Sequence, residues 1–145
     1  MDGGLISRNS LKIIQKVISW GSFAKKLIEG DMWEGPRKGI QDDNMHPPIH
    51  PVKLKENRNG LTKEEWKVYE IIVRHFLASV AKDAVCFQTY IQCDIRSEVF
   101  IATGLTVEEY NWLEVFPYEK WNQKVLPDLQ PGQKFNPSSF SIQQS

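Results

Sequence analysis

Residues 62–94 read TKEEWKVYEIIVRHFLASVAKDAVCFQTYIQCD, and they contain the two periodicities that decide the fold. Thr62 is followed three residues later by Glu65, which is a capping box, the usual signal for a helix N-terminus. Apolar side chains then recur at helical spacing, as on the buried face of a helix. They are Trp66, Tyr69, Ile72, Val73, Phe76, Leu77 and Val80. The pattern predicts a core helix over 62–82.

The second periodicity is an alternation of outward and inward side chains that is typical of strands. Over 86–94, mainly apolar odd positions alternate with mainly polar even positions, which predicts a strand. A polar turn leads to a second predicted strand over 98–103, which Gly104 ends. We expect a third strand over 110–116, although 107–112 also fits a helical turn.

Two shorter helices are expected before the long one. Apolar residues recur at spacings of three and four over 11–18, and a second helix over 22–28 has Ser22 as its N-cap. Residues 30–60 are rich in glycine, proline and polar side chains, so we expect them to form mostly loop. A helical subdomain is therefore followed by a small antiparallel β portion, which places the chain in the α+β class.

The composition is that of an ordinary globular protein. The 145 residues are 41% hydrophobic and 25% charged, which suits one domain or two small pieces of a larger one. No apolar run approaches the 18 or so residues of a membrane helix, and the N-terminus lacks a signal-peptide pattern. Cys86 and Cys93 project to opposite faces of the predicted strand. We therefore expect no disulfide between them, and a reducing compartment.

The net charge of zero hides an asymmetry between the two parts of the chain. Residues 1–82 contain 14 Lys and Arg against 10 Asp and Glu, a balance of +4. Residues 83–145 contain 4 against 8, a balance of −4. A basic part joined to an acidic part indicates that one part contacts a polyanion. We expect a helical subdomain over 1–82, a β-rich portion over 83–137 and a disordered tail over 138–145.

The main candidate for a functional segment is the run DDNMHPPIHP, residues 42–51. Each proline fixes its own φ and favours an extended residue before it, so the run holds His46 in a defined direction. That imidazole either donates a hydrogen bond to a phosphate or reacting oxygen, or merely caps the loop. Arg37 and Lys38 stand in a glycine-flanked loop before the run. They are either solvated charges or contacts to a sugar-phosphate chain.

Other chemistry has less support in the sequence. His46 and His50 are not expected to bind a metal together, because the prolines prevent the helix on which positions i and i+4 share a face. No Gly-x-Ser-x-Gly and no glycine-rich phosphate loop occurs, so self-contained nucleophilic catalysis is not expected. Arg74, which lies with Lys67 on a basic outer face of the predicted helix, forms an ion pair or contacts phosphate. Trp33 either packs in the core or stacks on an exposed base.

Six segments then stand in a characteristic order. They are WGSFA (20–24), GPR (35–37), DNMHPPIHP (43–51), YEIIVRHFLA (69–78), ATGL (102–105) and YNWLEVFPYEKW (110–121). In this order they resemble the type IA DNA topoisomerases of the eukaryotic topoisomerase III group. The similarity extends continuously over about residues 19–137.

The resemblance implies an isomerase that passes one DNA strand through a transient break in another, with a tyrosine nucleophile and a magnesium-binding acidic domain. It implies that this stretch joins part of the tyrosine-bearing helical domain to part of the β-rich arch that forms the hinge of the gate. By motif match, His46 helps to position the scissile phosphate. We expect Arg37, Lys38 and Arg74 to bind DNA. Nuclear location is also implied, and we expect the remainder of the topoisomerase, or a recombination or repair protein, as a partner.

The sequence departs from the family at decisive points. It contains no Tyr-Pro-Arg-Thr-Glu-Thr motif with the nucleophile and no Asp-x-Asp motif for magnesium, and Val52 stands where the family usually has Thr. We therefore expect this chain alone to bind single-stranded DNA without cleaving it, with no cofactor of its own. The alternative is a non-catalytic interaction module whose proline-rich run docks into an aromatic groove of a protein partner.

Overall fold

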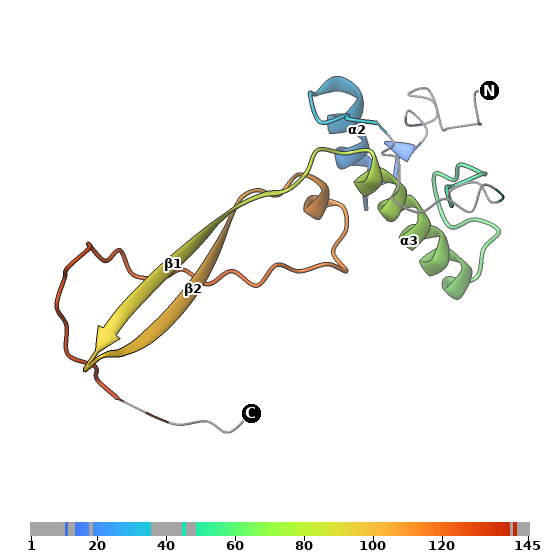
Figure 1. Ribbon diagram of the computed structural model, residues 1–145. Coiled ribbons are helices and arrows are strands. Elements are labelled where there is room, and N and C mark those ends of the chain that lie inside the picture. The colour runs from blue at the N-terminus through green and yellow to red at the C-terminus, as the bar shows by residue number, and fades with distance from the viewer. Residues whose placement is uncertain are drawn as a thin grey trace. The chain divides into compact units, whose positions relative to one another are not determined.

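The computed structural model of the chain describes residues 11, 14–17, 19–35, 45, 49–139 and 141. Figure 1 shows the elements along the chain. They are the helices α2 (Gly21–Glu29) and α3 (Lys63–Ser79), the strands β1 (Val85–Ile95) and β2 (Glu98–Glu109), and the 3₁₀ helix η1 (Asn111–Glu114). Helices together with a two-stranded antiparallel sheet confirm the α+β class.

Contacts divide the chain into two compact units. The helical unit comprises Met1–Cys86 and Val107–Asn122, and the hairpin unit comprises Phe87–Thr106 and Gln123–Ser145. The sequence predicted a β-rich portion over 83–137, whereas the helical unit defined by contacts also includes residues 107–122. The chain leaves the helical unit in β1 and returns to it at the end of β2, so residues 107–122 pack with the helices.

Helix α3 begins as its capping box predicts. The Thr62 hydroxyl accepts a hydrogen bond from the Glu65 backbone N–H at 3.2 Å, and the Glu65 carboxylate accepts one from the Thr62 N–H at 2.8 Å. The helix ends at Ser79, three residues before the predicted end. The chain then becomes extended, because the Lys82 N–H donates to the Met32 carbonyl at 3.0 Å.

Three segments that are distant in the sequence build the core of the helical unit. Its buried side chains come from the segment leading through α2, from the second half of α3 and the residues after it, and from the end of η1. They are Leu11, Ile14, Val17, Trp20, Phe23, Ala24, Leu27, Val73, Phe76, Leu77, Val80, Ala81 and Val115. The helix predicted over 11–18 lies partly outside the described residues, but Leu11 and Ile14 are helical and fully buried.

Helix α2 confirms the prediction of a helix over 22–28 but not its cap. The N-cap residue is Trp20, which makes no side-chain cap hydrogen bond, and Ser22 is an exposed residue inside the helix. Gly21 is the first helical residue because the chain passes very close to the preceding turn there. A Cβ at Gly21 would lie 2.0 Å from the Gln15 carbonyl oxygen, which no other residue type could accommodate without a backbone shift.

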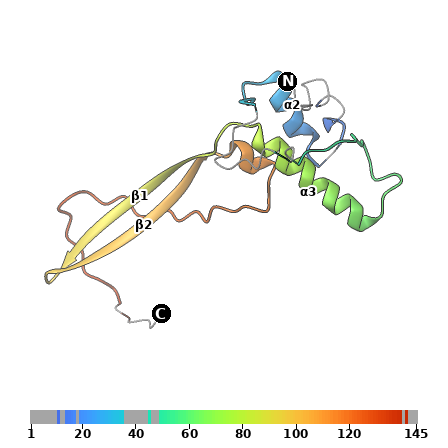
Figure 2. The ribbon, with the colours of Figure 1, turned by 45° about the vertical axis from the view of Figure 1, so that its right-hand side comes forward.

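The hairpin unit contains most of β1 and β2, which lie side by side in Figures 1 and 2. The predicted turn between them is confirmed: Arg96 and Ser97 have φ of 52° and 70°, and the Asp94 side chain accepts a hydrogen bond from the Ser97 N–H at 3.0 Å. Two positive φ values in a two-residue hairpin loop match the right-handed twist of the flanking strands. Both predicted strands are confirmed, and both are longer than predicted.

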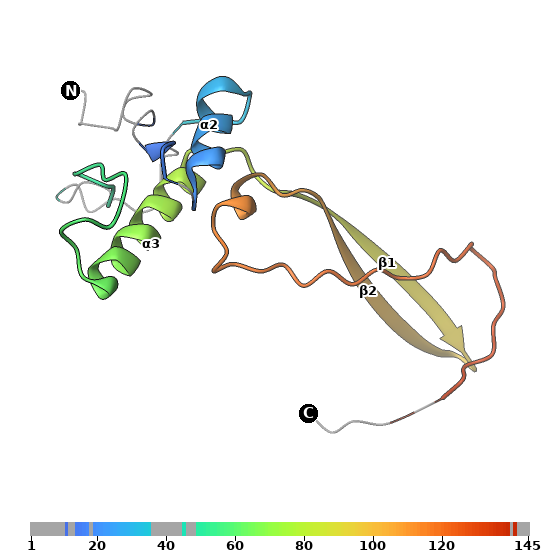
Figure 3. The same cartoon turned by 180° about the vertical axis from the view of Figure 1, so that it is seen from behind.

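Strand β2 continues through Gly104, where the sequence predicted its end. The glycine instead allows the later part of the chain to approach β2, as seen from behind in Figure 3. A Cβ there would lie 2.6 Å from the Lys124 carbonyl oxygen and 2.8 Å from the Leu126 Cγ. Leu105 and Lys124 exchange two backbone hydrogen bonds of 3.0 and 2.9 Å beside it. Gly104 is therefore a contact position and not a strand terminator.

The third strand predicted over 110–116 is wrong. This segment forms η1, in which the Leu113 N–H donates to the Tyr110 carbonyl at 2.8 Å. Asn111 adopts a φ of 41°, a left-handed conformation that asparagine tolerates well, and its side chain donates to the Asp83 carbonyl at 2.6 Å. The chain turns there instead of remaining extended, which carries Val115 into the core.

Candidate nucleic-acid interface

The structure describes the flanks of the predicted interface. Arg37, Lys38 and His46 lie outside the described residues, so their predicted roles stay predictions. The described end of the histidine-proline run belongs to the helical unit: Pro51 is buried and His50 is half-buried. Burial of the last proline fixes one end of the run to this unit.

The loop between the run and α3 has no regular secondary structure, but it is attached to the unit at several positions. Leu54 packs against the core. The backbone N–H of Lys55 donates to the Tyr69 hydroxyl at 2.9 Å in a partly buried hydrogen bond. Lys16 Nζ lies 2.6 Å from Glu56 Oε1, with both side chains about half exposed. An exposed ion pair contributes little, so the buried contacts carry most of the attachment.

An aromatic cluster lies under this attachment and is built by Trp20, Trp66 and Tyr69. The rings of Trp20 and Trp66 are stacked, with centroids 5.7 Å apart and planes at 28°. Tyr69 completes the cluster, with its centroid 5.5 Å from Trp66 and 6.4 Å from Trp20. Ring pairs at these separations are within the favourable range for aromatic contacts. The cluster therefore holds the tyrosine ring, and with it the hydroxyl that binds the loop.

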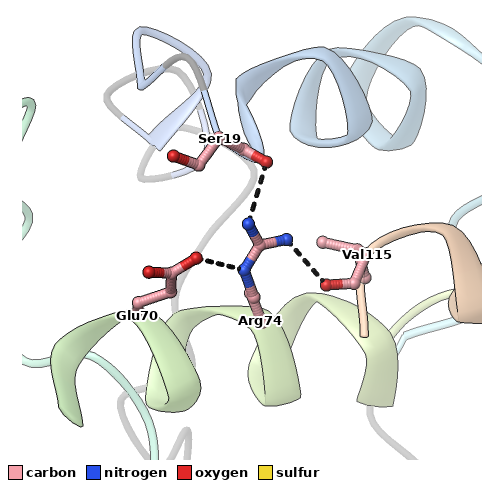
Figure 4. A network of polar contacts seen from close by, with 4 residues as sticks. All are labelled: Ser19, Glu70, Arg74 and Val115. Atoms are coloured by element: carbon pink, nitrogen blue, oxygen red, sulfur yellow. Dashed lines mark hydrogen bonds and ion pairs between the residues drawn. The ribbon is translucent and has the colours of Figure 1, made fainter. Parts of the chain in front are cut away.

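Arg74 joins three segments of the helical unit, as Figure 4 shows. Its Nε donates to Glu70 Oε1 at 2.7 Å, one Nη donates to the Val115 carbonyl at 3.0 Å, and the other donates to the Ser19 carbonyl at 3.2 Å. The guanidinium carbon also lies 5.5 Å from the ring centroid of Trp20. The side chain is only 12% exposed. Arg74 thus donates hydrogen bonds to backbone carbonyls of two other segments, while Glu70 in α3 supplies the negative charge opposite it.

These contacts confirm one alternative for Arg74 and correct its predicted orientation. The ion-pair interpretation is confirmed by Glu70. The basic outer face shared with Lys67 is wrong, because Lys67 is exposed whereas Arg74 lies among other segments. A guanidinium has five N–H donors, and three of them are used here. These three donors are occupied within the part of the chain that the structure describes, and the DNA contact predicted for Arg74 stays a prediction.

An exposed ion pair lies where the segment after α2 meets the segment after α3. Lys82 Nζ is 2.7 Å from Asp31 Oδ2. The hydrogen bond from Lys82, together with its positive charge, lowers the pKa of the Asp31 carboxyl, and the hydrogen bond to Asp31 raises the pKa of Lys82. Both groups are at the surface, so this pair contributes little to stability and is screened by salt.

A second aromatic cluster lies between α3 and the end of η1. Its rings contact one another at centroid distances of 5.3–6.3 Å. Its members are His75, Trp112, Phe116, Tyr118 and Trp121. Residues 107–122 contain four Glu and one Lys, so their charge does not favour a polyanion. Trp33, which the sequence offered as a core residue or as a platform for a stacked base, is half-buried and packs against the core.

Within the described residues, no group of three or more His, Cys, Asp or Glu side chains could hold a metal ion. The same part of the chain has no helix of the length and apolarity needed to cross a membrane.

The sequence-based prediction missed the roles of Trp20 and Tyr69. Periodicity placed Tyr69 in the apolar stripe of the helix, which is correct for its ring. The available signal was its hydroxyl, because a tyrosine in a buried stripe normally finds a hydrogen-bond partner. The partner, the Lys55 amide, could not be identified from spacing, since it belongs to a loop 14 residues away.

Comparison with known proteins identifies the family. Residues 6–145 match the family model described as DNA topoisomerase. The chain belongs to the DNA topoisomerase family. DNA topoisomerase 3-alpha of Drosophila melanogaster is 47% identical over 124 residues, covering 85% of this chain and 9% of that protein. The human DNA topoisomerase 3-alpha is 42% identical over 123 residues, covering 85% of this chain and 12% of that protein.

A fungal relative extends the match over nearly the whole chain. DNA topoisomerase 3 of Schizosaccharomyces pombe is 40% identical over 143 residues, which cover 96% of this chain and 23% of that protein. These relatives confirm the resemblance to the topoisomerase III group of the type IA DNA topoisomerases. The chain spans less than a quarter of the length of the relatives it matches.

Proposed function

We propose that this chain is a segment of a topoisomerase III-like enzyme that breaks, passes and rejoins single DNA strands. The observation that carries the proposal is the similarity to topoisomerase III proteins over 85% or more of the chain. The sequence has no tyrosine motif for strand cleavage and no Asp-x-Asp motif. By itself the chain therefore binds single-stranded DNA and does not cleave it.

The interface of this proposal is the segment that includes Arg37, Lys38 and His46. The two cations neutralise phosphates, and the imidazole donates a hydrogen bond to the scissile phosphate of the complete enzyme. The residues that follow this segment in the sequence support the proposal, because Pro51, Leu54 and Lys55 attach them to the helical unit. Arg74 would add a phosphate contact through guanidinium N–H groups other than the three that bond described residues.

Several wider assignments follow from the same family membership and belong to the proposal. The hairpin unit would be part of the β-rich arch that serves as the hinge of the gate. Magnesium would be required by the complete enzyme, where it would neutralise charge at the broken strand. The described residues of this chain do not fit such a metal, since they form no suitable acidic cluster. The nucleus would be the site of action, with recombination or repair proteins as partners.

A titration with a labelled single-stranded oligonucleotide tests the binding. Replacing Arg37 and Lys38 by alanine removes two phosphate contacts, which should lower the slope of log affinity against log salt by about 1.4. The matched control is Lys120→Ala/Lys134→Ala, which removes the same charge from exposed positions and should leave the slope unchanged. No binding at low salt, or equal slopes for the two variants, contradicts the assignment.

A relaxation assay tests the catalytic part separately. With magnesium present, the chain alone is expected to leave negatively supercoiled DNA unchanged. Relaxation would show that the chain has a nucleophile of its own. The other function considered, a non-catalytic module whose proline run docks into a protein, has no support from the comparisons.

A further inference from the structure

We propose that the outer edge of β1 pairs with β1 of a second copy of this chain, so that two hairpins form one continuous antiparallel sheet. Within the described residues, β1 pairs only with β2. The outer edge of β2 is already used at one position, because Leu105 exchanges two backbone hydrogen bonds with Lys124. In the part of the chain that the structure describes, the outer edge of β1 makes no such backbone contact.

The turn of the hairpin determines which backbone groups of β1 point outward. Since the loop has two residues, Ile95 and Glu98 close it as a hydrogen-bonded pair, and such pairs recur at every second residue. The intervening residues of β1 direct their N–H and C=O groups away from β2. They are Cys86, Gln88, Tyr90, Gln92 and Asp94. The same register directs the backbone of Leu105 away from β1, as its bonds to Lys124 require.

The β1 edge lacks the residues that usually prevent strands from pairing with other chains. Natural edge strands are often protected by lysine or proline. β1 is 11 residues long, contains no Lys, Arg, Pro or Gly, and has Asp94 as its one charged residue. The side chains of Gln88, Tyr90 and Gln92 are exposed along it. Because a two-stranded sheet is only marginally stable, an added strand stabilises it.

β1 is complementary to a second copy of itself when the two strands run antiparallel about a two-fold axis at Tyr90. Every outward-facing residue of one strand then lies opposite an outward-facing residue of the other, as a symmetric interface requires. Gln88 lies opposite Gln92 of the second copy, and their side-chain amides are able to exchange hydrogen bonds. Asp94 lies opposite Cys86 and not opposite a second Asp94. This register therefore brings no like charges together.

Analytical ultracentrifugation of the full chain, without DNA and over a wide range of concentrations, tests the pairing. We expect a monomer–dimer equilibrium in which the Gln88 and Gln92 amides exchange hydrogen more slowly as the dimer forms. A chain that stays monomeric overturns the proposal. Slow exchange in that monomer would show that another segment of the same chain covers the edge, and fast exchange would leave it open to a different protein. Higher oligomers without a dimer would overturn the two-fold arrangement.

Two double variants test the register. Gln88→Lys/Gln92→Lys places like charges opposite each other in both symmetry-related pairs, which should raise the dimer dissociation constant about tenfold. Gln88→Lys/Gln92→Glu places opposite charges there and should dimerise at least as tightly as the wild type. Within one strand the two positions are about 13 Å apart, so the charges interact weakly inside a single chain. Equal dissociation constants for the two variants overturn the register.

A proline substitution tests the edge itself. Gln92→Pro removes an outward N–H and no hydrogen bond to β2, so the dimer dissociation constant should rise about tenfold or more. Ile101→Pro is the matched control, because Ile101 lies opposite Gln92 in the hairpin and its N–H points to the other edge. This control should dimerise like the wild type. If it weakens the dimer as much as Gln92→Pro does, pairing does not occur through β1. Circular dichroism checks that both variants fold, and the charge variants keep the test decisive if they do not.

Discussion

Removing Arg74 should destabilise the helical unit more than removing any exposed cation. The Arg74→Ala change deletes a hydrogen bond to Glu70, one to the Val115 carbonyl and one to the Ser19 carbonyl. It leaves a carboxylate that is only 25% exposed without its countercharge. Hydrogen bonds to charged groups contribute about 1.5–3 kcal/mol each, and removing one partner of this partly buried ion pair costs less than the loss of about 3–5 kcal/mol for a fully buried pair. Since these terms overlap, we expect a total loss of about 3–4 kcal/mol.

The geometry predicts a graded result for Arg74→Lys. An ammonium keeps the charge opposite Glu70, but it lacks the planar fork that reaches two carbonyls in different directions. We therefore expect a smaller loss, of about 2 kcal/mol. Lys67→Ala on the same helix is the control, because this exposed lysine should change stability by less than about 0.5 kcal/mol.

Urea unfolding followed by tryptophan fluorescence measures these differences. All five tryptophans lie in the helical unit, so their combined emission reports the unfolding of this unit. A loss of about 3 kcal/mol lowers the urea midpoint by about 1–3 M for ordinary urea slopes. A loss below about 1 kcal/mol for Arg74→Ala would refute the reasoning, and so would equal losses for the alanine and lysine variants.

Three further predictions concern the close approaches and the exposed ion pair. Gly21→Ala places a Cβ 2.0 Å from the Gln15 carbonyl oxygen, so a thermal melt should show a loss of at least about 1–3 kcal/mol; an unchanged melting temperature contradicts this packing. Gly104→Ala should push Lys124 away from β2, and hydrogen exchange of the Lys124 amide should accelerate; unchanged protection would disprove the contact. Asp31 has a lowered pKa in the folded state, so its small stabilising effect is present above the unfolded-state pKa of about 3.9 and is lost as pH falls through the folded-state pKa. When both proteins are titrated with acid in low salt, the stability of Asp31→Asn should lack this part of the pH dependence that the wild type shows.

Helix α3 could be predicted because its signals are local. The capping box lies within four residues, and the apolar stripe repeats within the helix itself. The hairpin was predictable for the same reason, since alternation and a polar turn are also local patterns. In both elements the local preference of the sequence agrees with the final fold. Sequence patterns were therefore sufficient to predict them.

The errors arose where distant contacts override local pattern. Over 110–116 the residues alternate well enough for a strand, but Asn111 turns the chain and Val115 enters a core formed by the helices. At Gly104 the glycine marks close approach by a segment 20 residues later, not the end of a strand. Arg74 was assigned to an outer face because periodicity does not reveal that two other segments pass over α3 at that position.

The same contacts explain why a boundary at residue 82, where the charge balance changes, would not isolate the helical unit. Val115 is 1% exposed within the core, and its carbonyl accepts a hydrogen bond from Arg74. A chain that ended at residue 82 would lack the Val115 side chain. Its Arg74 guanidinium would also lose the Val115 carbonyl as a hydrogen-bond acceptor. The Arg74 network thus makes the helices depend on residues that the chain reaches only after completing β1 and β2. Composition reports where polarity changes along the sequence, whereas the unit is defined by which segments return to the same core.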